Sequence, residues 1–309
     1  MARHSMARHS GEWPREQSEA VLPSRLAPPL LRPGLVPRAA VLRHLTASAD
    51  IPVVALIAPA GYGKTTLLAQ WRRRDARRFG WVSLDEGTDD PAVLLTCLAA
   101  AVARAVPVEA AVLRDLEVPD SPARRRALAG LAVSVASAPH PFVLAIDDCH
   151  RLTDPENLRS VETLAANLPP GCQLALAGRT EPTLPLARLR AEGRVLDVGV
   201  TELRMNALNA ADLLRAAGVD LTPRQVADLT AHTGGWPVGI YLAALAHRKG
   251  SPGRAAPVPV RGDDRLMACS FPHRGREGRI VPTSAAECTS RARNRVRPVS
   301  TSPRSDHVR

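Results

Sequence analysis

Short apolar runs alternate with amphipathic segments over most of the chain. Four runs are apolar at nearly every position, which is typical of strands that are buried on both faces of a sheet. They cover residues 52–57, 79–84, 142–146 and 173–177. Helical periodicity marks the segments around them, at residues 38–48, 65–76, 91–105, 122–136 and 155–167. This alternation predicts an α/β fold, with a parallel sheet flanked by helices.

From residue 186 onward the pattern predicts helices alone. They cover residues 207–217, 222–233 and 236–248. Thr222 followed by Pro223 is typical of a helix start, because a capping residue precedes proline at the first helical position. We read this part of the chain as a small helical lid domain.

Four segments follow from these patterns. A sheet domain with a proline-rich, extended lead-in is predicted over residues 23–185, and the lid domain over residues 186–266. Residues 1–22 begin with a duplicated pentapeptide and are expected to be disordered, as chain ends often are. Residues 267–309 are expected to be disordered because this segment cannot bury enough apolar surface to offset its ordering entropy.

The net charge of +11 suggests a nucleic-acid partner at first sight, but its distribution weakens that suggestion. Residues 249–309 hold 13 basic and 5 acidic residues, whereas residues 1–248 hold 28 and 25. The basic excess therefore belongs to the tail and says little about the folded body.

Membrane and secretory classes are disfavoured. No apolar run approaches the roughly 18 residues of a membrane helix, and no apolar stretch behind the N-terminal arginines suggests a signal peptide. The five cysteines form no CxxC pair, so neither a zinc site nor a disulfide framework is expected. A reducing, cytoplasmic setting fits this composition.

The strongest chemical signal is Ala58-Pro-Ala-Gly-Tyr-Gly-Lys-Thr-Thr66, which follows a predicted buried strand and opens a predicted helix. Glycines let backbone N–H groups turn toward phosphate oxygens, and the helix start adds a favourable dipole. Lys64 would reach the β- and γ-phosphates, and Thr65 would hold Mg²⁺. Ala58 replaces the first glycine of the usual GxxxxGK[ST] pattern, and a plain glycine turn is the alternative. The candidate phosphate-binding residues are Ala60, Gly61, Tyr62, Gly63, Lys64, Thr65 and Thr66.

Asp147 and Asp148 end the strand predicted at residues 142–146, which places carboxylates at the same sheet edge as the phosphate loop. Asp147 would help to hold Mg²⁺, and Asp148 would orient or polarise the attacking water. An acidic pair after a strand is otherwise often a helix cap. Cys149 and His150 follow directly, and a nucleophile–base pair is the less favoured reading of them, since adjacent residues rarely face each other.

Two further segments bear on the site. Arg179 ends another strand and would sense the γ-phosphate, although a surface arginine is an equally good reading. Gly234-Gly-Trp-Pro237 separates two predicted helices and reads as a helix–helix turn with a buried tryptophan. The basic run at residues 72–78 is interpreted as a solvated helix end rather than a nucleic-acid patch, because no aromatic residues are interleaved with it.

Together, six segments resemble the N-terminal ATPase module of the large LuxR-type (MalT-like) bacterial transcription regulators, a branch of the STAND NTPases related to AAA+ ATPases. The resemblance covers roughly residues 25–266. The segments that carry it are 31–38 (LRPGLVPR), 58–71 (APAGYGKTTLLAQW), 81–85 (WVSLD), 145–148 (AIDD, with His150), 179–182 (RTEP) and 235–237 (GWP).

The resemblance implies a P-loop NTPase in which ATP or ADP sits between the sheet domain and the lid. It implies phosphate binding by residues 61–66, help with Mg²⁺ from Asp147, slow hydrolysis supported by Asp148, and nucleotide sensing by Arg179. It also implies that Pro237 lies near the adenine and that Arg38 flanks the nucleotide. The implied activity is a switch, in which an inducer and ATP favour self-association and promoter activation, while ADP holds the resting form.

The sequence departs from that family after residue 266. Full-length members continue into a helical-repeat sensor and a DNA-binding helix-turn-helix, so no sequence-specific DNA binding is expected from this chain. We interpret residues 267–309 as frameshifted sequence or, alternatively, as a basic tail that binds anions non-specifically. The alternative functions are a stand-alone P-loop ATPase or kinase, or a fragment that retains only nucleotide binding.

Overall fold

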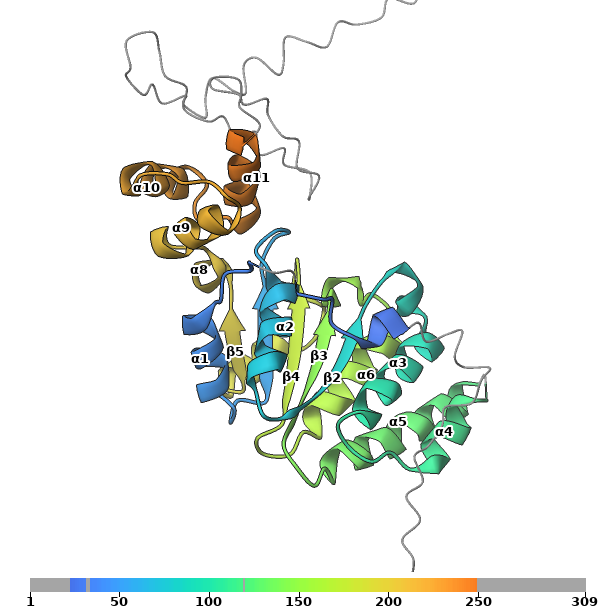
Figure 1. Ribbon diagram of the computed structural model, residues 1–309. Helices are drawn as coiled ribbons and strands as arrows, with labels where there is room; N and C mark the ends of the chain where they lie inside the picture. Colours follow the sequence, from blue (N-terminus) through green and yellow to red (C-terminus); the bar gives the residue numbers. More distant parts are fainter. Residues whose placement is uncertain (1–22, 32–33, 119, 249–309) are drawn as a thin grey trace, which may run out of the picture. The chain divides into compact units, whose positions relative to one another are not determined.

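The computed structural model describes residues 23–31, 34–118 and 120–248 (Figure 1). The chain divides into two compact units, Met1–Tyr241 and Leu242–Arg309, and the second contributes only residues 242–248 to the described part. The predictions for residues 1–22 and 267–309, and for the last part of the lid domain, fall outside the described residues. Within those residues no helix is long and apolar enough to cross a membrane.

One parallel sheet of five strands forms the centre of the first unit, in the order β2-β3-β4-β1-β5. The strands are β1 (Val53–Ile57), β2 (Arg78–Ser83), β3 (Phe142–Asp147), β4 (Gln173–Gly178) and β5 (Val195–Val198). Val53 lies opposite Leu174 of β4 on one side and Val195 of β5 on the other. β1 is therefore an interior strand, and its carboxyl end leads into the glycine loop for which the sequence predicts phosphate binding.

Helices cover both faces of the sheet (Figure 1). Those of the sheet region are α1 (Ala39–Ala47), α2 (Lys64–Arg74), α3 (Pro91–Ala103), α4 (Ala110–Leu116), α5 (Ser121–Ala136), α6 (Pro155–Ala166) and α7 (Leu186–Ala191). The later ones are α8 (Val200–Leu203), α9 (Ala207–Ala216), α10 (Pro223–His232) and α11 (Pro237–Arg248). Short 3-10 turns complete the described elements: η2 (Pro23–Leu26), η3 (Glu86–Asp89) and η4 (Cys149–Arg151).

The two faces of the sheet bury alternate residues of each strand. On β3, Leu144 and Ile146 pack into one apolar cluster with α3, α5 and α6. Val143 and Ala145 of the same strand pack into the opposite cluster with α1 and α2. Successive side chains of a strand point to opposite faces, so a strand covered on both sides must be apolar throughout. This is why the interior strands could be recognised from the sequence.

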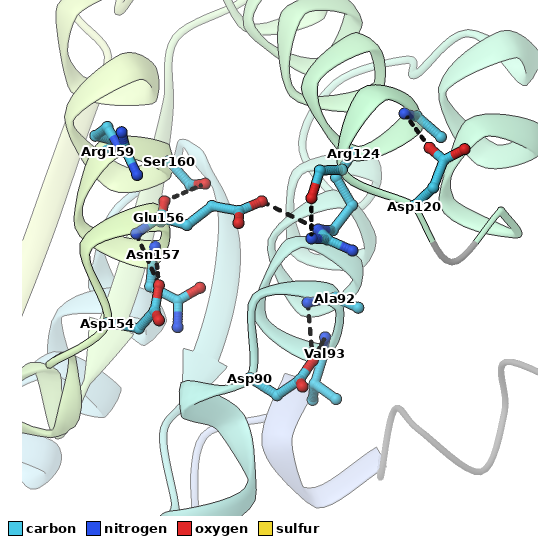
Figure 2. A network of polar contacts seen from close by, with 12 residues as sticks. Asp90, Ala92, Val93, Asp120, Arg124, Asp154, Glu156, Asn157, Arg159 and Ser160 are labelled. Carbon is cyan, nitrogen blue, oxygen red and sulfur yellow. Dashed lines mark hydrogen bonds and ion pairs between the residues drawn. The ribbon is translucent and has the colours of Figure 1, made fainter.

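Figure 2 shows how helix starts are fixed on one side of the sheet. Asp90, Asp120 and Asp154 accept hydrogen bonds from the first backbone N–H groups of α3, α5 and α6. Arg124 of α5 donates to Glu156 of α6 at 3.0 Å. Each cap satisfies N–H groups that have no partner inside the helix, and the ion pair ties two neighbouring helices together.

The predicted fold class is confirmed: the chain is α/β, with a parallel sheet flanked by helices and a glycine loop between β1 and α2. The expectation of helices alone after residue 186 was wrong, because β5 pairs with β1 at residues 195–198. β5 is a four-residue edge strand with an exposed Asp197, so it lacks the continuous apolar run of an interior strand. The domain boundaries remain predictions.

Candidate functional site

The loop between β1 and α2 has the backbone of an anion cradle. Gly61 and Gly63 have φ values of 82° and 80°, in the left-handed region that favours glycine. Gly63 is the N-cap of α2 and makes no side-chain cap. Among the described residues, nothing accepts a hydrogen bond from the N–H groups of Gly61, Gly63 or Lys64. Successive free N–H groups at a helix start are a binding site for an anion.

Lys64 lies buried at the base of this loop, with 8% of its surface exposed. Its Nζ donates to the carbonyl oxygens of Ala58 at 2.6 Å and Pro59 at 3.1 Å. Burial lowers the pKa of Lys64, while the carboxylates of Asp147 and Asp148 act in the opposite direction and favour its ammonium form. The carbonyl groups and the carboxylates together hold a positive charge beside the cradle.

Asp147 is the last residue of β3 and is 3% exposed. Its Oδ1 accepts a hydrogen bond from the Asp148 backbone N–H at 3.1 Å, and the nearby Thr65 side chain acts to lower the pKa of the carboxyl group. Burial outweighs these contacts and raises the pKa of Asp147 to about 6. The structure thus brings together Thr65 and Asp147, the two residues that the sequence suggested for a metal ion.

Thr65 and Asp147 fit an Mg²⁺ ion that takes its other ligands from waters and phosphates. Hydroxyl and carboxylate oxygens are the ligands that Mg²⁺ prefers, and protein sites for this ion typically supply one or two ligands beside waters and phosphates. Within the described part of the chain, no group of three or more His, Cys, Asp or Glu side chains is arranged so that it could hold a metal ion. The donor set therefore suits an ion that arrives with a phosphate rather than an ion held by protein alone.

Asp148 has a strained backbone. Its φ of 57° and ψ of 35° make it the non-glycine residue with positive φ among the residues described. Asp tolerates this conformation better than most residues do, and such outliers cluster at functional sites. Its side chain is 45% exposed, next to the buried Asp147. One carboxylate is thus enclosed and its neighbour reaches solvent.

His150 connects the ends of β3 and β4. Its Nδ1 accepts a hydrogen bond from the Arg179 backbone N–H at 3.4 Å and lies 3.7 Å from Oδ1 of Asp148. Burial lowers the pKa of His150, which favours the neutral ring that can accept this hydrogen bond. The Arg179 side chain is exposed and lies near enough to disfavour the charged forms of Lys64 and His150.

Cys149 is not available as a nucleophile. Its side chain is fully buried, and burial raises the pKa of its thiol to about 12. A thiol in this state is neither ionised at neutral pH nor accessible. A Cβ added to Gly178 would lie 2.7 Å from the Cys149 sulfur, so this thiol packs against the backbone of β4. The residue is structural.

Residues from the later helices also meet the loop. Trp236 Nε1 donates to the Ala60 carbonyl oxygen at 3.0 Å, and the Val238 N–H donates to the Gly61 carbonyl oxygen at 3.3 Å. Pro237, which lies between them, is the first residue of α11. The sequence pointed to a buried tryptophan here, but it did not show that the partner of the tryptophan is the phosphate loop.

The guanidinium of Arg38 donates hydrogen bonds to backbone carbonyl groups. Its Nη2 donates to the carbonyl oxygens of Glu202 and Arg204, each at 3.0 Å, and burial lowers its pKa. Gln70 of α2 accepts from the Arg38 N–H at 3.2 Å. Arg38 therefore joins the lead-in to α2 and to the end of α8, and its contact with a nucleotide remains a prediction.

The chain is similar in sequence to known transcriptional regulators over most of its length. No protein-family model matches the chain. The HTH-type transcriptional regulator MalT of Cronobacter sakazakii is 29% identical over 231 residues, which cover 74% of this chain and 26% of that protein. MalT of Yersinia enterocolitica is 30% identical, with the same coverage. A chain in the structure of Drosophila ORC bound to DNA aligns with a TM-score of 0.43 and 11% identity, over 81% of this chain and 65% of that one.

The chain is homologous to the N-terminal region of MalT-like regulators. It spans about a quarter of the length of these relatives. The homology confirms the resemblance drawn from the sequence.

Proposed function

We propose that this chain binds ATP or ADP at the loop between β1 and α2, as the nucleotide-dependent module of a MalT-like transcriptional regulator. One observation carries the proposal: a glycine cradle with unused N–H groups belongs to the same loop whose first carbonyl groups, those of Ala58 and Pro59, accept hydrogen bonds from the buried ammonium of Lys64. A polyphosphate suits this combination, because the N–H groups and the ammonium offer hydrogen bonds and positive charge at one point. Gly61 to Thr66 bind the phosphates, and Ala60 completes the loop.

Thr65 and Asp147 hold Mg²⁺ in the loaded protein. The ion neutralises phosphate charge when it is bound. Asp147 must be ionised to serve as a ligand, and Lys64 and the ion both favour the ionised form. This requirement gives a function to a carboxylate that is otherwise unfavourably buried.

Slow hydrolysis of ATP is assigned to Asp148. Its exposed carboxylate lies one residue beyond the metal-binding Asp147, and a carboxylate in this place can accept a proton from an attacking water. Arg179 directly follows the neighbouring strand β4, and its side chain is exposed. We assign to it the contact with the γ-phosphate. Both assignments rest on position at the sheet edge.

The module acts as a switch within a larger cytoplasmic regulator. ATP favours self-association and ADP favours the resting form, with Pro237 beside the adenine and Arg38 at the flank of the nucleotide. Light scattering of the purified chain with each nucleotide tests the self-association. A molar mass that is the same with ATP, with ADP and without nucleotide contradicts it.

The binding proposal is tested by denaturing the purified chain and identifying released nucleotide by chromatography. We expect stoichiometric ADP or ATP. If the chain is purified empty, ADP with Mg²⁺ should raise its melting temperature. The Lys64→Ala variant is the control, and it should show less bound nucleotide and a smaller rise at the same ADP concentration. Absence of released nucleotide together with an unchanged melting temperature in the wild-type chain would overturn the proposal.

A further inference from the structure

Two hydrogen bonds attach the start of α11 to the phosphate loop. Trp236 Nε1 donates to the Ala60 carbonyl oxygen at 3.0 Å, and the Val238 N–H donates to the Gly61 carbonyl oxygen at 3.3 Å. The indole is buried, with 9% exposed. A Cβ added to Gly61 would lie 2.7 Å from Trp236 Nε1 and 2.9 Å from Cγ2 of Val238. The loop and the helix start are thus in close contact at the glycine itself.

These bonds also determine where the neighbouring N–H groups point. In a trans peptide the carbonyl oxygen and the following N–H point in opposite directions, and the described residues contain no cis peptide bond. When Trp236 holds the Ala60 carbonyl, the Gly61 N–H is directed to the other side of the peptide. When Val238 holds the Gly61 carbonyl, the Tyr62 N–H is fixed in the same manner.

We propose that Trp236 is a positioning residue for phosphate binding, whose indole N–H holds the loop with its amides in the anion-binding orientation. The inference rests on the proposed function, because the amides it orients are those assigned to the nucleotide phosphates. Linkage makes the effect mutual: the contact that favours nucleotide binding is itself favoured by bound nucleotide. The segment at the start of α11 therefore responds to occupancy of the loop through its hydrogen bonds to the Ala60 and Gly61 carbonyl oxygens.

A purely structural role for Trp236 predicts something different. The ring also packs on Gly239, where an added Cβ would lie 2.6 Å from Cε3 of the indole. If the ring served only to join α10 to α11, its replacement would lower stability and leave nucleotide affinity unchanged. The two roles are separated by removing the N–H while keeping an aromatic ring.

The test uses Trp236→Phe in the full chain, with Trp81→Phe as the matched control. Trp81 is also buried, and its Nε1 donates to Ser83 Oγ at 2.8 Å on β2. Each variant loses one indole hydrogen bond from the interior. Calorimetric titration with ADP and Mg²⁺ should show about three- to tenfold weaker binding for Trp236→Phe, the range that one neutral hydrogen bond supports. Trp81→Phe should bind like the wild type.

Tryptophan emission gives a second readout. ADP should change the emission of the wild type and of Trp81→Phe, and this change should be lost in Trp236→Phe. If Trp236→Phe does not fold, benzothienylalanine at position 236 keeps the two fused rings and lacks only the donor. It should weaken ADP binding to the same extent.

The possible results distinguish failure of nucleotide binding from failure of the role proposed for Trp236. A wild-type chain that binds no ADP overturns the proposed function, and this inference with it. A wild-type chain that binds ADP, with unchanged affinity and an unchanged emission response in a folded position-236 variant, overturns the inference alone. Weaker binding confined to the position-236 variants supports it.

Discussion

Replacing Asp147 with asparagine should make the empty protein more stable. The carboxylate is almost completely buried at the end of β3, and burial raises its pKa from 3.8 to about 6. Asparagine has the same shape, keeps the oxygen that accepts from the Asp148 N–H, and puts an NH₂ group in place of the second carboxylate oxygen. The substitution therefore removes the charge and leaves the local contacts in place.

The magnitude follows from proton linkage. Between pH 3.8 and about 6 the folded protein holds a proton that the unfolded chain has lost, so stability falls as the pH rises through this window. Above it, the buried carboxylate costs about 3 kcal/mol, at about 1.36 kcal/mol for each pH unit. Asp147→Asn should thus raise the free energy of unfolding by about 3 kcal/mol at pH 7.5 and by about half as much at pH 5.

Urea denaturation of the nucleotide-free protein at these two pH values measures the effect. Comparison of variant with wild type at each pH cancels the titration of other carboxylates. Asp148→Asn is the control, because it removes the same charge from a side chain that is 45% exposed. It should change stability by less than about 0.5 kcal/mol. A variant Asp147→Asn that is no more stable at pH 7.5, or equally stabilised at both pH values, would refute burial of the charge as the cause.

The same variant should lose the response of nucleotide affinity to Mg²⁺, since an amide oxygen replaces the anionic ligand. Higher stability combined with a lost metal response is expected of a residue kept for function at a cost in stability. If Mg²⁺ still tightens ATP binding to Asp147→Asn as it does to the wild type, Asp147 is not a metal ligand.

Three further predictions concern the site. Lys64→Ala should weaken ADP binding by about 10- to 150-fold, because a charge-assisted hydrogen bond contributes about 1.5–3 kcal/mol. The control is Arg73→Ala, which removes an exposed charge from the far end of α2 and should bind ADP like the wild type in the same titration. Equal affinity of the two variants for ADP would exclude Lys64 from the binding site. Asp148→Asn should bind ATP and lose its hydrolysis in a phosphate-release assay, so turnover at the wild-type rate would remove Asp148 from the mechanism. Cys149, with its thiol pKa raised to about 12 by burial, should react with a thiol reagent only after denaturation, and fast labelling of the native protein at this residue would contradict its burial.

The sequence predicts the interior of the sheet well and its edge poorly. β1, β3 and β4 are buried on both faces, so their apolar runs are visible without any knowledge of partners. The loop before Lys64 can be predicted from the sequence equally well, because Gly61 and Gly63 adopt left-handed backbone conformations that favour glycine. β5 is short and partly exposed, and what makes it a strand is its pairing with β1, which lies far away in the sequence.

The same distinction applies to the site. The sequence could predict that Thr65 and Asp147 lie close together, because the carboxyl ends of the strands of a parallel sheet meet at one edge. The link between Trp236 and the Ala60 carbonyl spans 176 residues, and no periodicity or composition reports it. The left-handed backbone of Asp148 is likewise invisible in the sequence, since aspartate occurs in many backbone conformations.

The late position of β5 has a consequence for how the chain is made. During synthesis, β1 emerges long before residues 195–198, and the side of β1 that β5 will cover stays open meanwhile. An open strand edge of this kind can pair with another chain and lead to aggregation. A shortened chain that stops at residue 185 would keep that edge permanently, beside the phosphate loop. Soluble expression of the sheet should therefore require the chain to extend past Val198, and the step at which the sheet closes should be among the slowest in folding.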